Sequence, residues 1–231
     1  VAGQVNESLL ANPRLVVTAP PGAGKSTLLP LSMLEGIGEG RILMLEPRRL
    51  AARQVAERMA SMLGETCGQT VGFRVRFETR VSARTRVEVL TEGILERLLV
   101  SDPTLDGVAA VIFDEFHERS LASDTALALT MEVQDVIRPD LRIVIMSATI
   151  DATDLCRRIG APHIDSPGRM HDVGIVYGDD FDPRECAAVT ARAVCRAHRE
   201  QQGDILAFLP GQGEIARCAE LLGGSLPDTE I

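Results

Sequence analysis

The sequence lacks several features that mark specialised classes of protein. It contains no tryptophan, only 3% aromatic residues, and five cysteines that form no C-x-x-C pair. Scattered cysteines argue against a zinc site or a disulfide framework, and they favour reduced thiols and a cytoplasmic location. No apolar run is long enough to cross a bilayer and no signal peptide is visible, so we expect no membrane partner.

Basic charge is also scarce. The net charge of the 231 residues is −9, which argues against indiscriminate binding of polyanions. Residues 73–86 are a local exception, because they hold five arginines and one glutamate. This patch is either a basic track on the surface or the solvated face of a strand. The apolar content of 45% suffices for one or two domains with a real core.

Lysine is the rarest basic residue, since Lys25 is the only one among 24 basic side chains. It lies in a glycine-rich loop between the apolar run Leu15–Val17 and an apolar segment that begins at Leu28. A strand, such a loop and a helix together form a cradle for a triphosphate. The residues expected to bind the nucleotide are Ala19, Pro20, Pro21, Gly22, Ala23, Gly24, Lys25, Ser26 and Thr27.

The residue types in this loop suit phosphate chemistry. Gly22 and Gly24 can adopt positive φ, which lets backbone N–H groups approach anionic oxygens. A helix that begins near Lys25 directs its free N–H groups and its dipole at the same phosphates. Lys25 would reach the β- and γ-phosphates, and the Ser26 hydroxyl would bind Mg²⁺. The first position usually holds glycine and here holds Ala19, so the alternative is an ordinary turn between a strand and a helix.

Apolar runs alternate with segments of helical spacing along the first two thirds of the chain. We expect strands at 15–18, 41–45, 71–77, 86–90, 108–113 and 141–146. The helices expected between and before them span 4–11, 26–35, 50–63, 94–100 and 121–137. This alternation predicts an α/β fold, a mostly parallel sheet with helices on both faces.

Polar clusters follow directly on five of these strands. They are Gly22–Thr27, Glu46–Arg49, Thr91–Gly93, Asp114–His117 and Ser147–Thr149. Because the carboxyl ends of parallel strands share one edge of the sheet, these clusters are expected to converge there.

An acid pair ends the apolar strand at 108–113. Asp114 is placed to hold the Mg²⁺ that Ser26 carries, and Glu115 to bind the metal and deprotonate an attacking water. The alternative is a solvated turn. His117 follows at fixed spacing and is expected to pass the nucleotide state to the rest of the protein, although a lone histidine is more often structural. Lys25, Asp114, Glu115 and His117 are therefore the predicted catalytic residues.

Three small polar residues follow the strand at 141–146. Ser147, Ala148 and Thr149 could be an ordinary turn or a helix cap. Their position after a strand, beyond the acid pair, favours a coupling role between the nucleotide edge and a polymer.

The pattern changes after residue 150. Proline- and glycine-containing connections lead to a weak strand at 173–177, a helix at 187–198, a strand at 204–209 and a helix at 213–222. We expect a first domain at 1–170 and, at 171–231, the beginning of a second α/β domain. The chain is expected to be a fragment of something longer.

Three stretches carry a family resemblance. They are Leu-Glu-Pro-Arg-Arg-Leu-Ala-Ala-Arg at 45–53, Asp-Glu-Phe-His-Glu-Arg-Ser at 114–120 and Phe-Leu-Pro-Gly-Gln-Gly-Glu-Ile at 208–215. They resemble, in this order, motifs Ia, II and IV of the DEAH-box helicases of superfamily two. The glycine-rich loop resembles motif I of the same family, and residues 91–95 and 147–149 resemble motifs Ib and III. Phe116 departs from the alanine of the usual box and is similar to a bacterial subgroup.

The resemblance implies a RecA-like P-loop NTPase fold and an ATP-dependent helicase that uses ATP and Mg²⁺. Its partner would be a single nucleic-acid strand, RNA rather than DNA, lying along Arg48, Arg49, Thr91 and Gly93. Arginines and helix N-termini bind phosphate without reading sequence, and the low aromatic content argues against base stacking as the main grip. No oligomeric state is predicted.

The family's motifs V and VI, which bring arginine fingers to the γ-phosphate, are not found in these 231 residues. Such a finger is worth about 10³–10⁵ in rate, so we expect slow hydrolysis and little unwinding by this chain. Two alternatives stay open: a nucleotide-gated clamp on nucleic acid without unwinding, and a P-loop ATPase that acts on a protein or a small molecule.

Overall fold

The structure is a computed structural model that describes residues 2–20, 22–148, 152–166, 172–226 and 229–231. It divides into two compact units, Val1–Met170 and His171–Ile231, and each is described here by itself.

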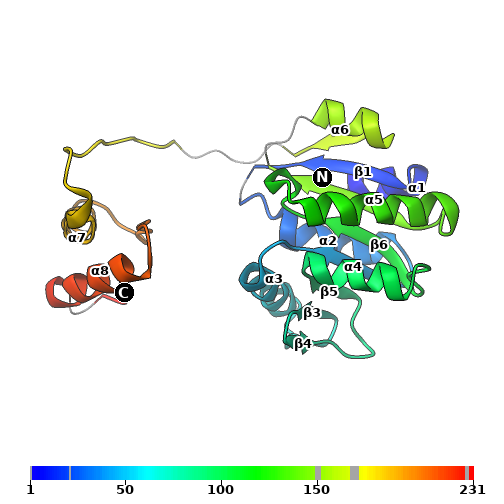
Figure 1. The fold of residues 1–231 in the computed structure, drawn as a ribbon, viewed down its shortest axis with the longest axis horizontal. Helices are drawn as coiled ribbons and strands as arrows, with labels where there is room; N and C mark the ends of the chain where they lie inside the picture. Colours follow the sequence, from blue (N-terminus) through cyan, green and yellow to red (C-terminus); the bar gives the residue numbers. More distant parts are fainter. Residues whose placement is uncertain (1, 21, 149–151, 167–171, 227–228) are drawn as a thin grey trace. The chain divides into compact units, whose positions relative to one another are not determined.

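The first unit is built on an eight-stranded sheet in the order β4-β3-β5-β2-β6-β7-β1-β8 (Figure 1). Neighbouring strands run parallel, except that β3 and β4 are antiparallel. The strands are β1 (Arg14–Thr18), β2 (Arg41–Leu45), β3 (Val71–Val75), β4 (Glu78–Arg80), β5 (Val87–Leu90), β6 (Val108–Phe113), β7 (Arg142–Ser147) and β8 (His163–Asp165). The expected α/β class with a mostly parallel sheet is confirmed.

Helices cover both faces of this sheet (Figure 1). One face packs against α1 (Ala2–Ala11), α2 (Lys25–Gly36) and α3 (Arg49–Met62). The other face packs against α4 (Glu92–Ser101), α5 (Leu121–Val136) and α6 (Ala152–Ile159). Side chains alternate between the faces along a strand, and both faces are covered, so the interior positions of the central strands β2, β6 and β7 are apolar.

The sheet begins and ends with short elements that the sequence analysis did not anticipate. A single strand was expected over 71–77, but β3 ends at Val75 and the chain turns into the antiparallel β4. Phe77 lies in this turn with φ 72° and is exposed, so it cannot continue the ladder. The three-residue β8 was also missed, because so short a segment carries too little periodicity, and so was α6, although its eight residues are amphipathic.

The second unit consists of two helices, α7 (Cys186–Glu200) and α8 (Gln212–Ser225), and a 3₁₀ turn at Pro183–Glu185. The helices pack through small side chains and one leucine: Ala187, Ala191, Cys218 and Leu222. The predictions of helices at 187–198 and 213–222 are confirmed.

The two strands expected in this unit are not formed. Residues 173–177 and 204–209 have no regular structure, and apolar side chains such as Tyr177 and Phe208 are exposed. A strand requires a hydrogen-bonded neighbour, and neither segment has one among the described residues of this unit. The expectation of strands here was therefore wrong, although a strand-like sequence pattern is present.

Within the part of the chain that the structure describes, no helix has the length and apolar character needed to cross a bilayer.

Candidate functional site

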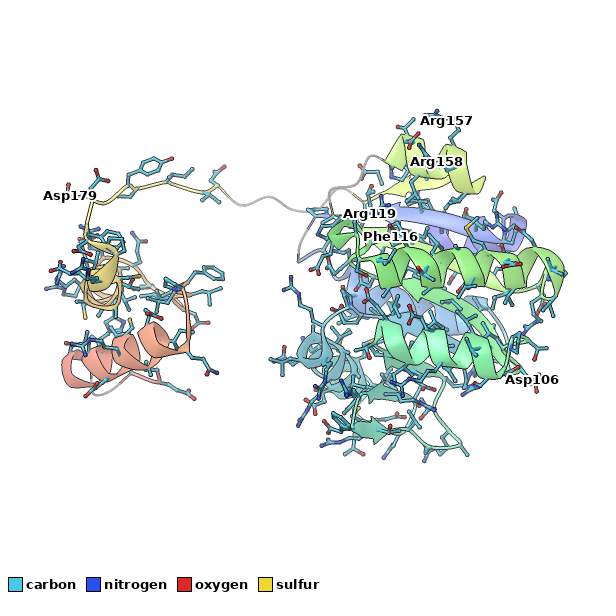
Figure 2. All side chains as sticks on the ribbon, viewed as in Figure 1. Asp106, Phe116, Arg119, Arg157, Arg158 and Asp179 are labelled. Atoms are coloured by element: carbon cyan, nitrogen blue, oxygen red, sulfur yellow. The ribbon has the colours of Figure 1, made fainter. Side chains whose placement is uncertain are left out.

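The described residues of the five polar clusters lie at one edge of the sheet, as the parallel strand order requires. Figure 2 shows the two ends of the sheet: Asp106 precedes β6, and Phe116 follows it at the opposite end. Glu46 and Asp114 also meet at this edge, because the Glu46 N–H donates to Leu90 O (2.9 Å) and the Asp114 N–H donates to Leu45 O (3.0 Å). Clusters that are far apart in sequence thus become neighbours.

The glycine-rich loop has the backbone that a phosphate cradle needs. Gly22 and Gly24 adopt φ of 78° and 80°, in the left-handed region that L side chains rarely enter. Gly24 is the N-cap of α2, so the helix begins at Lys25. The loop is tied to the end of β7, because the Ala19 N–H donates to Ser147 O (3.1 Å). Pro21 lies outside the described residues.

A pocket of about 180 Å³ lies against this loop and is lined in part by Ala19, Gly24, Lys25 and Ser166. Ser166 follows β8 and its N–H donates to Thr18 O, 2.7 Å away. The sequence analysis missed this segment, because β8 has only three residues.

Lys25 and Glu115 form an ion pair, with 3.1 Å between Nζ and Oε1. The Lys25 side chain is 8% exposed and that of Glu115 is 28% exposed. The other Glu115 oxygen, Oε2, lies 3.3 Å from His117 Nδ1. The ammonium group of Lys25 is therefore held by Glu115, the second residue of the acid pair.

Asp114 is the buried member of the acid pair, with 2% exposure. Its Oδ1 accepts the Glu115 N–H (2.8 Å), whereas its Oδ2 has no partner among the described residues. Burial raises the pKa of this carboxyl group to about 6, and the nearby Ser26 hydroxyl opposes that rise. A buried carboxylate oxygen without a partner fits a cation such as Mg²⁺.

Mg²⁺ typically binds one or two carboxylates together with substrate phosphates. Among the residues described here, no group of three or more His, Cys, Asp or Glu residues is placed to hold a metal ion. Ser26 is the second residue of α2, and its hydroxyl is near the Asp114 carboxyl group, so Ser26 and Asp114 are suited to hold the metal jointly. Glu115, which was also predicted as a metal ligand, forms an ion pair with Lys25 in this structure.

The end of β7 reaches the same site. The Ala148 N–H donates to His117 Nδ1 at 3.5 Å, which connects the predicted coupling segment to the acid pair. Ser147 is completely buried and its Oγ has no partner among the described residues. Thr149 lies outside the described residues.

The residues predicted to line a strand track follow the neighbouring strands β2 and β5. Arg48 is the exposed N-cap of α3, and its guanidinium pairs with Glu118 at 2.8 Å. Arg49 begins α3 and donates to Arg76 O (3.1 Å), which secures the turn between β3 and β4. Thr91 is the N-cap of α4 and Gly93 is exposed, so both mark the free N-terminus of that helix.

The arginines of residues 73–86 are mostly engaged inside the fold. Arg74 Nε donates to the buried Glu88 (2.7 Å), and Arg86 donates to Gly38 O and Gly40 O. Arg80 lies near Glu78 at 3.3 Å. These contacts favour the strand-face interpretation of the patch over a free basic track.

Two acidic residues of this edge were not singled out from the sequence. Glu46 is 4% exposed, and burial together with the Asp114 charge raises the pKa of its carboxyl group to about 7. Glu118 pairs with Arg48. Glu46 lies in the cluster Glu46–Arg49 and Glu118 in the stretch 114–120, so the sequence could have marked both as candidate site residues. Only the fold shows which partners they face.

The sheet order, the left-handed glycines before α2 and the acid pair after β6 define an α/β domain of the RecA-like class. The chain belongs to the DEAD/DEAH box helicase family, whose model matches residues 2–157.

Within that family, the chain is 47% identical over 216 residues to the ATP-dependent RNA helicase HrpB of Escherichia coli (strain K12). A crystal structure of the Escherichia coli DEAH/RHA helicase HrpB matches with a TM-score of 0.84 and 44% identity over 98% of this chain. A crystal structure of the E. coli DExH-box NTPase HrpB matches with a TM-score of 0.74 and 45% identity over 97% of this chain. The chain spans 27% of the length of the first relative and 29% and 28% of the two crystallised chains.

Proposed function

We propose that this chain forms the ATP-binding part of an ATP-dependent RNA helicase of the HrpB type. The ion pair between Lys25 and Glu115 carries the proposal, because it brings a phosphate-binding cation and a candidate general base into one site. Two similarities support the proposal. The chain is 47% identical to a relative that is named an ATP-dependent RNA helicase, and its structure matches a crystal structure of HrpB with a TM-score of 0.84.

In this proposal, Ala19–Thr27 bind the triphosphate and Lys25 moves from Glu115 to the β- and γ-phosphates. That exchange leaves the Glu115 carboxylate without its cation and free to accept a proton from the attacking water. His117 Nδ1 lies 3.3 Å from Glu115 Oε2 and 3.5 Å from the Ala148 nitrogen, so it donates to the acid when it carries the ring proton and accepts the Ala148 N–H when it does not. Ser147, Ala148 and Thr149 would then report the nucleotide state to the strand.

Mg²⁺, when bound, supplies positive charge to the phosphates at the transition state. Ser26 and Asp114 are the residues that would hold it, and Asp114 Oδ2 is the buried oxygen that has no other partner among the described residues. Burial of Asp114 also excludes water from that side of the site.

The strand would lie along Arg48, Arg49, Thr91 and Gly93, where one exposed guanidinium and the N-terminus of α4 face outward. Such groups bind the sugar–phosphate backbone irrespective of sequence. A reducing, cytoplasmic setting agrees with five free cysteines. Because the arginine-finger motifs of the family are not found in this sequence, we expect slow ATP hydrolysis by this chain.

The proposal is tested by measuring binding of a fluorescent single-stranded RNA to the chain, with and without a non-hydrolysable ATP analogue. We expect RNA binding that depends on the analogue and fails with Lys25→Ala in its presence. ATP binding without any RNA or DNA binding would instead favour an ATPase that acts on another substrate. Analogue-dependent RNA binding, with no strand displacement by the full-length protein, would favour a clamp.

A further inference from the structure

Arg48 and Glu118 form an ion pair at the edge of the sheet that carries the acid pair. The Arg48 guanidinium lies 2.8 Å from Glu118 Oε1, and the two side chains are 73% and 34% exposed. Arg48 follows β2, whereas Glu118 belongs to the 3₁₀ turn Phe116–Glu118 that follows β6. A ligand approaching from solvent can therefore reach both groups.

The turn that carries Glu118 is tightly bound to the acid pair. The Glu118 N–H donates to Glu115 O at 2.9 Å, so the two residues are linked through one hydrogen-bonded ring. The residues at either end, Glu115 and Arg119, adopt φ of 49° and 48°, a conformation that non-glycine residues rarely enter. A turn held in this way does not relax independently of its contacts.

Phe116 anchors the same turn in the core. It is 3% exposed and packs edge-on against Phe113, with 6.4 Å between ring centroids. Figure 2 shows Phe116 and Arg119 side by side, and the Arg119 guanidinium lies 5.4 Å from the Phe116 ring. Since the Phe116 ring is packed in the core, the turn that carries Glu118 is held in place and keeps the Glu118 carboxylate next to Arg48.

We propose that Glu118 is a positioning residue that competes with the phosphates of an incoming strand for the guanidinium of Arg48. This inference rests on the proposed function, because it takes Arg48 as a phosphate ligand. Without a strand, the Glu118 carboxylate occupies the guanidinium. A strand phosphate replaces it, because both anions accept the same planar pair of N–H donors.

The exchange also connects the strand to the nucleotide. Glu118 released from Arg48 remains hydrogen-bonded to Glu115, which itself pairs with Lys25. Strand binding therefore changes the charge balance beside the turn that carries the proposed general base, because the Glu118 carboxylate loses its cation while the backbone hydrogen bond to Glu115 O stays. Such coupling is reciprocal, so bound nucleotide should change the affinity for the strand by the same factor.

The test is a double-mutant cycle with Glu118→Gln and Arg48→Ala, using a fluorescein-labelled oligouridylate and the 231-residue chain saturated with a non-hydrolysable ATP analogue. An exposed ion pair of this kind is weak, so Glu118→Gln should tighten RNA binding by about two- to fivefold. In the Arg48→Ala background the same substitution should give no gain. Glu132→Gln, which neutralises an exposed carboxylate on α5, controls for net charge and should have little effect.

A second measurement separates competition from a purely structural role. The affinity for an ATP analogue is measured with and without saturating oligouridylate, and the ratio should shrink in Glu118→Gln relative to wild type. Tighter RNA binding that persists in the Arg48→Ala background, or no tightening at all, would overturn the inference while leaving the proposed function intact. A wild-type chain that binds ATP but no RNA would overturn both.

Discussion

Glu46 and Asp114 directly follow the neighbouring strands β2 and β6, and both carboxyl groups are buried at the same edge of the sheet. Glu46 is 4% exposed and Asp114 2% exposed. The pKa of Glu46 is raised to about 7 and that of Asp114 to about 6, in both cases mainly by burial. Two adjacent buried acids without a cation destabilise the fold once both ionise.

Glu46 should therefore make stability fall with rising pH. Its pKa is raised in the folded state, so the folded chain binds the proton more tightly than the unfolded chain. The penalty is absent below the unfolded pKa of 4.5, grows as the pH rises, and is complete above about 7. Glu46→Gln should remove it and stabilise the chain by about 1–3 kcal/mol at pH 8, with little gain at pH 4.5.

This expectation is measured by urea unfolding between pH 4.5 and 8 in buffer that contains EDTA. Glu39→Gln is the matched control, because Glu39 is exposed in the loop before β2. Equal pH dependence in wild type and Glu46→Gln would contradict the assignment. The Glu46→Gln side chain keeps an oxygen that can accept the Arg48 N–H, so the local turn is preserved.

Lys25→Ala should abolish tight binding of ATP. The substitution removes the only lysine of the chain, whose ammonium group lies 3.1 Å from Glu115. A charge-assisted hydrogen bond of about 1.5–3 kcal/mol corresponds to a loss of about 10- to 100-fold in affinity. Titration calorimetry with ATP measures it, and Arg58→Ala, which removes an exposed cation on α3, should bind like wild type. Unchanged affinity of Lys25→Ala would place the nucleotide elsewhere.

Asp114→Asn should remove the contribution of Mg²⁺ to nucleotide binding. Wild type should melt at a higher temperature with ATP and Mg²⁺ than with ATP and EDTA, at about 2–4 °C per kcal/mol of added binding energy. Asp114→Asn should lose this increment while remaining folded, because it removes a buried charge without changing the shape of the side chain. Asp106→Asn, at the opposite end of the sheet (Figure 2), should keep the increment. Retention of the increment in Asp114→Asn would exclude Asp114 as the metal ligand.

Arg48→Ala should weaken RNA binding and reduce its salt dependence. Loss of one phosphate contact lowers the slope of log affinity against log salt by about 0.7 for a single strand. Arg49→Ala should lower affinity less, because the Arg49 guanidinium already donates to Arg76 O. Fluorescence anisotropy at several salt concentrations measures both effects, with Arg58→Ala as the control. An unchanged slope in Arg48→Ala would remove this residue from the track.

Much of the first unit was predictable because its signals are local. Apolar runs such as 108–113 predicted the central strands, and the glycines at 22 and 24 predicted the loop before α2. The polar clusters after the strands predicted which edge of the sheet carries the candidate site, since parallel strands place their carboxyl ends together. The edge strands β4 and β8 were too short to detect, and β4 required a turn at Phe77 that no local pattern indicated; the amphipathic helix α6 was overlooked.

The segments at 173–177 and 204–209 show where prediction from local sequence fails in the other direction, because it predicted strands that the structure does not contain. Their sequence favours strands, yet neither forms one, because a strand is stabilised by a partner elsewhere in a sheet and no such partner occurs among the described residues of that unit. Local propensity without a ladder of hydrogen bonds does not make a strand.

By itself the sequence determined the α/β class, the order of the main elements of the first unit up to β7, and the loop and acids that make up the candidate site. Only the tertiary structure decided that Lys25 meets Glu115, that Glu46 is buried beside Asp114, and that Arg48 pairs with Glu118. The physical reason is that the strand order β5-β2-β6-β7-β1 is fixed by long-range packing, whereas periodicity and turn chemistry act only between near neighbours in the chain.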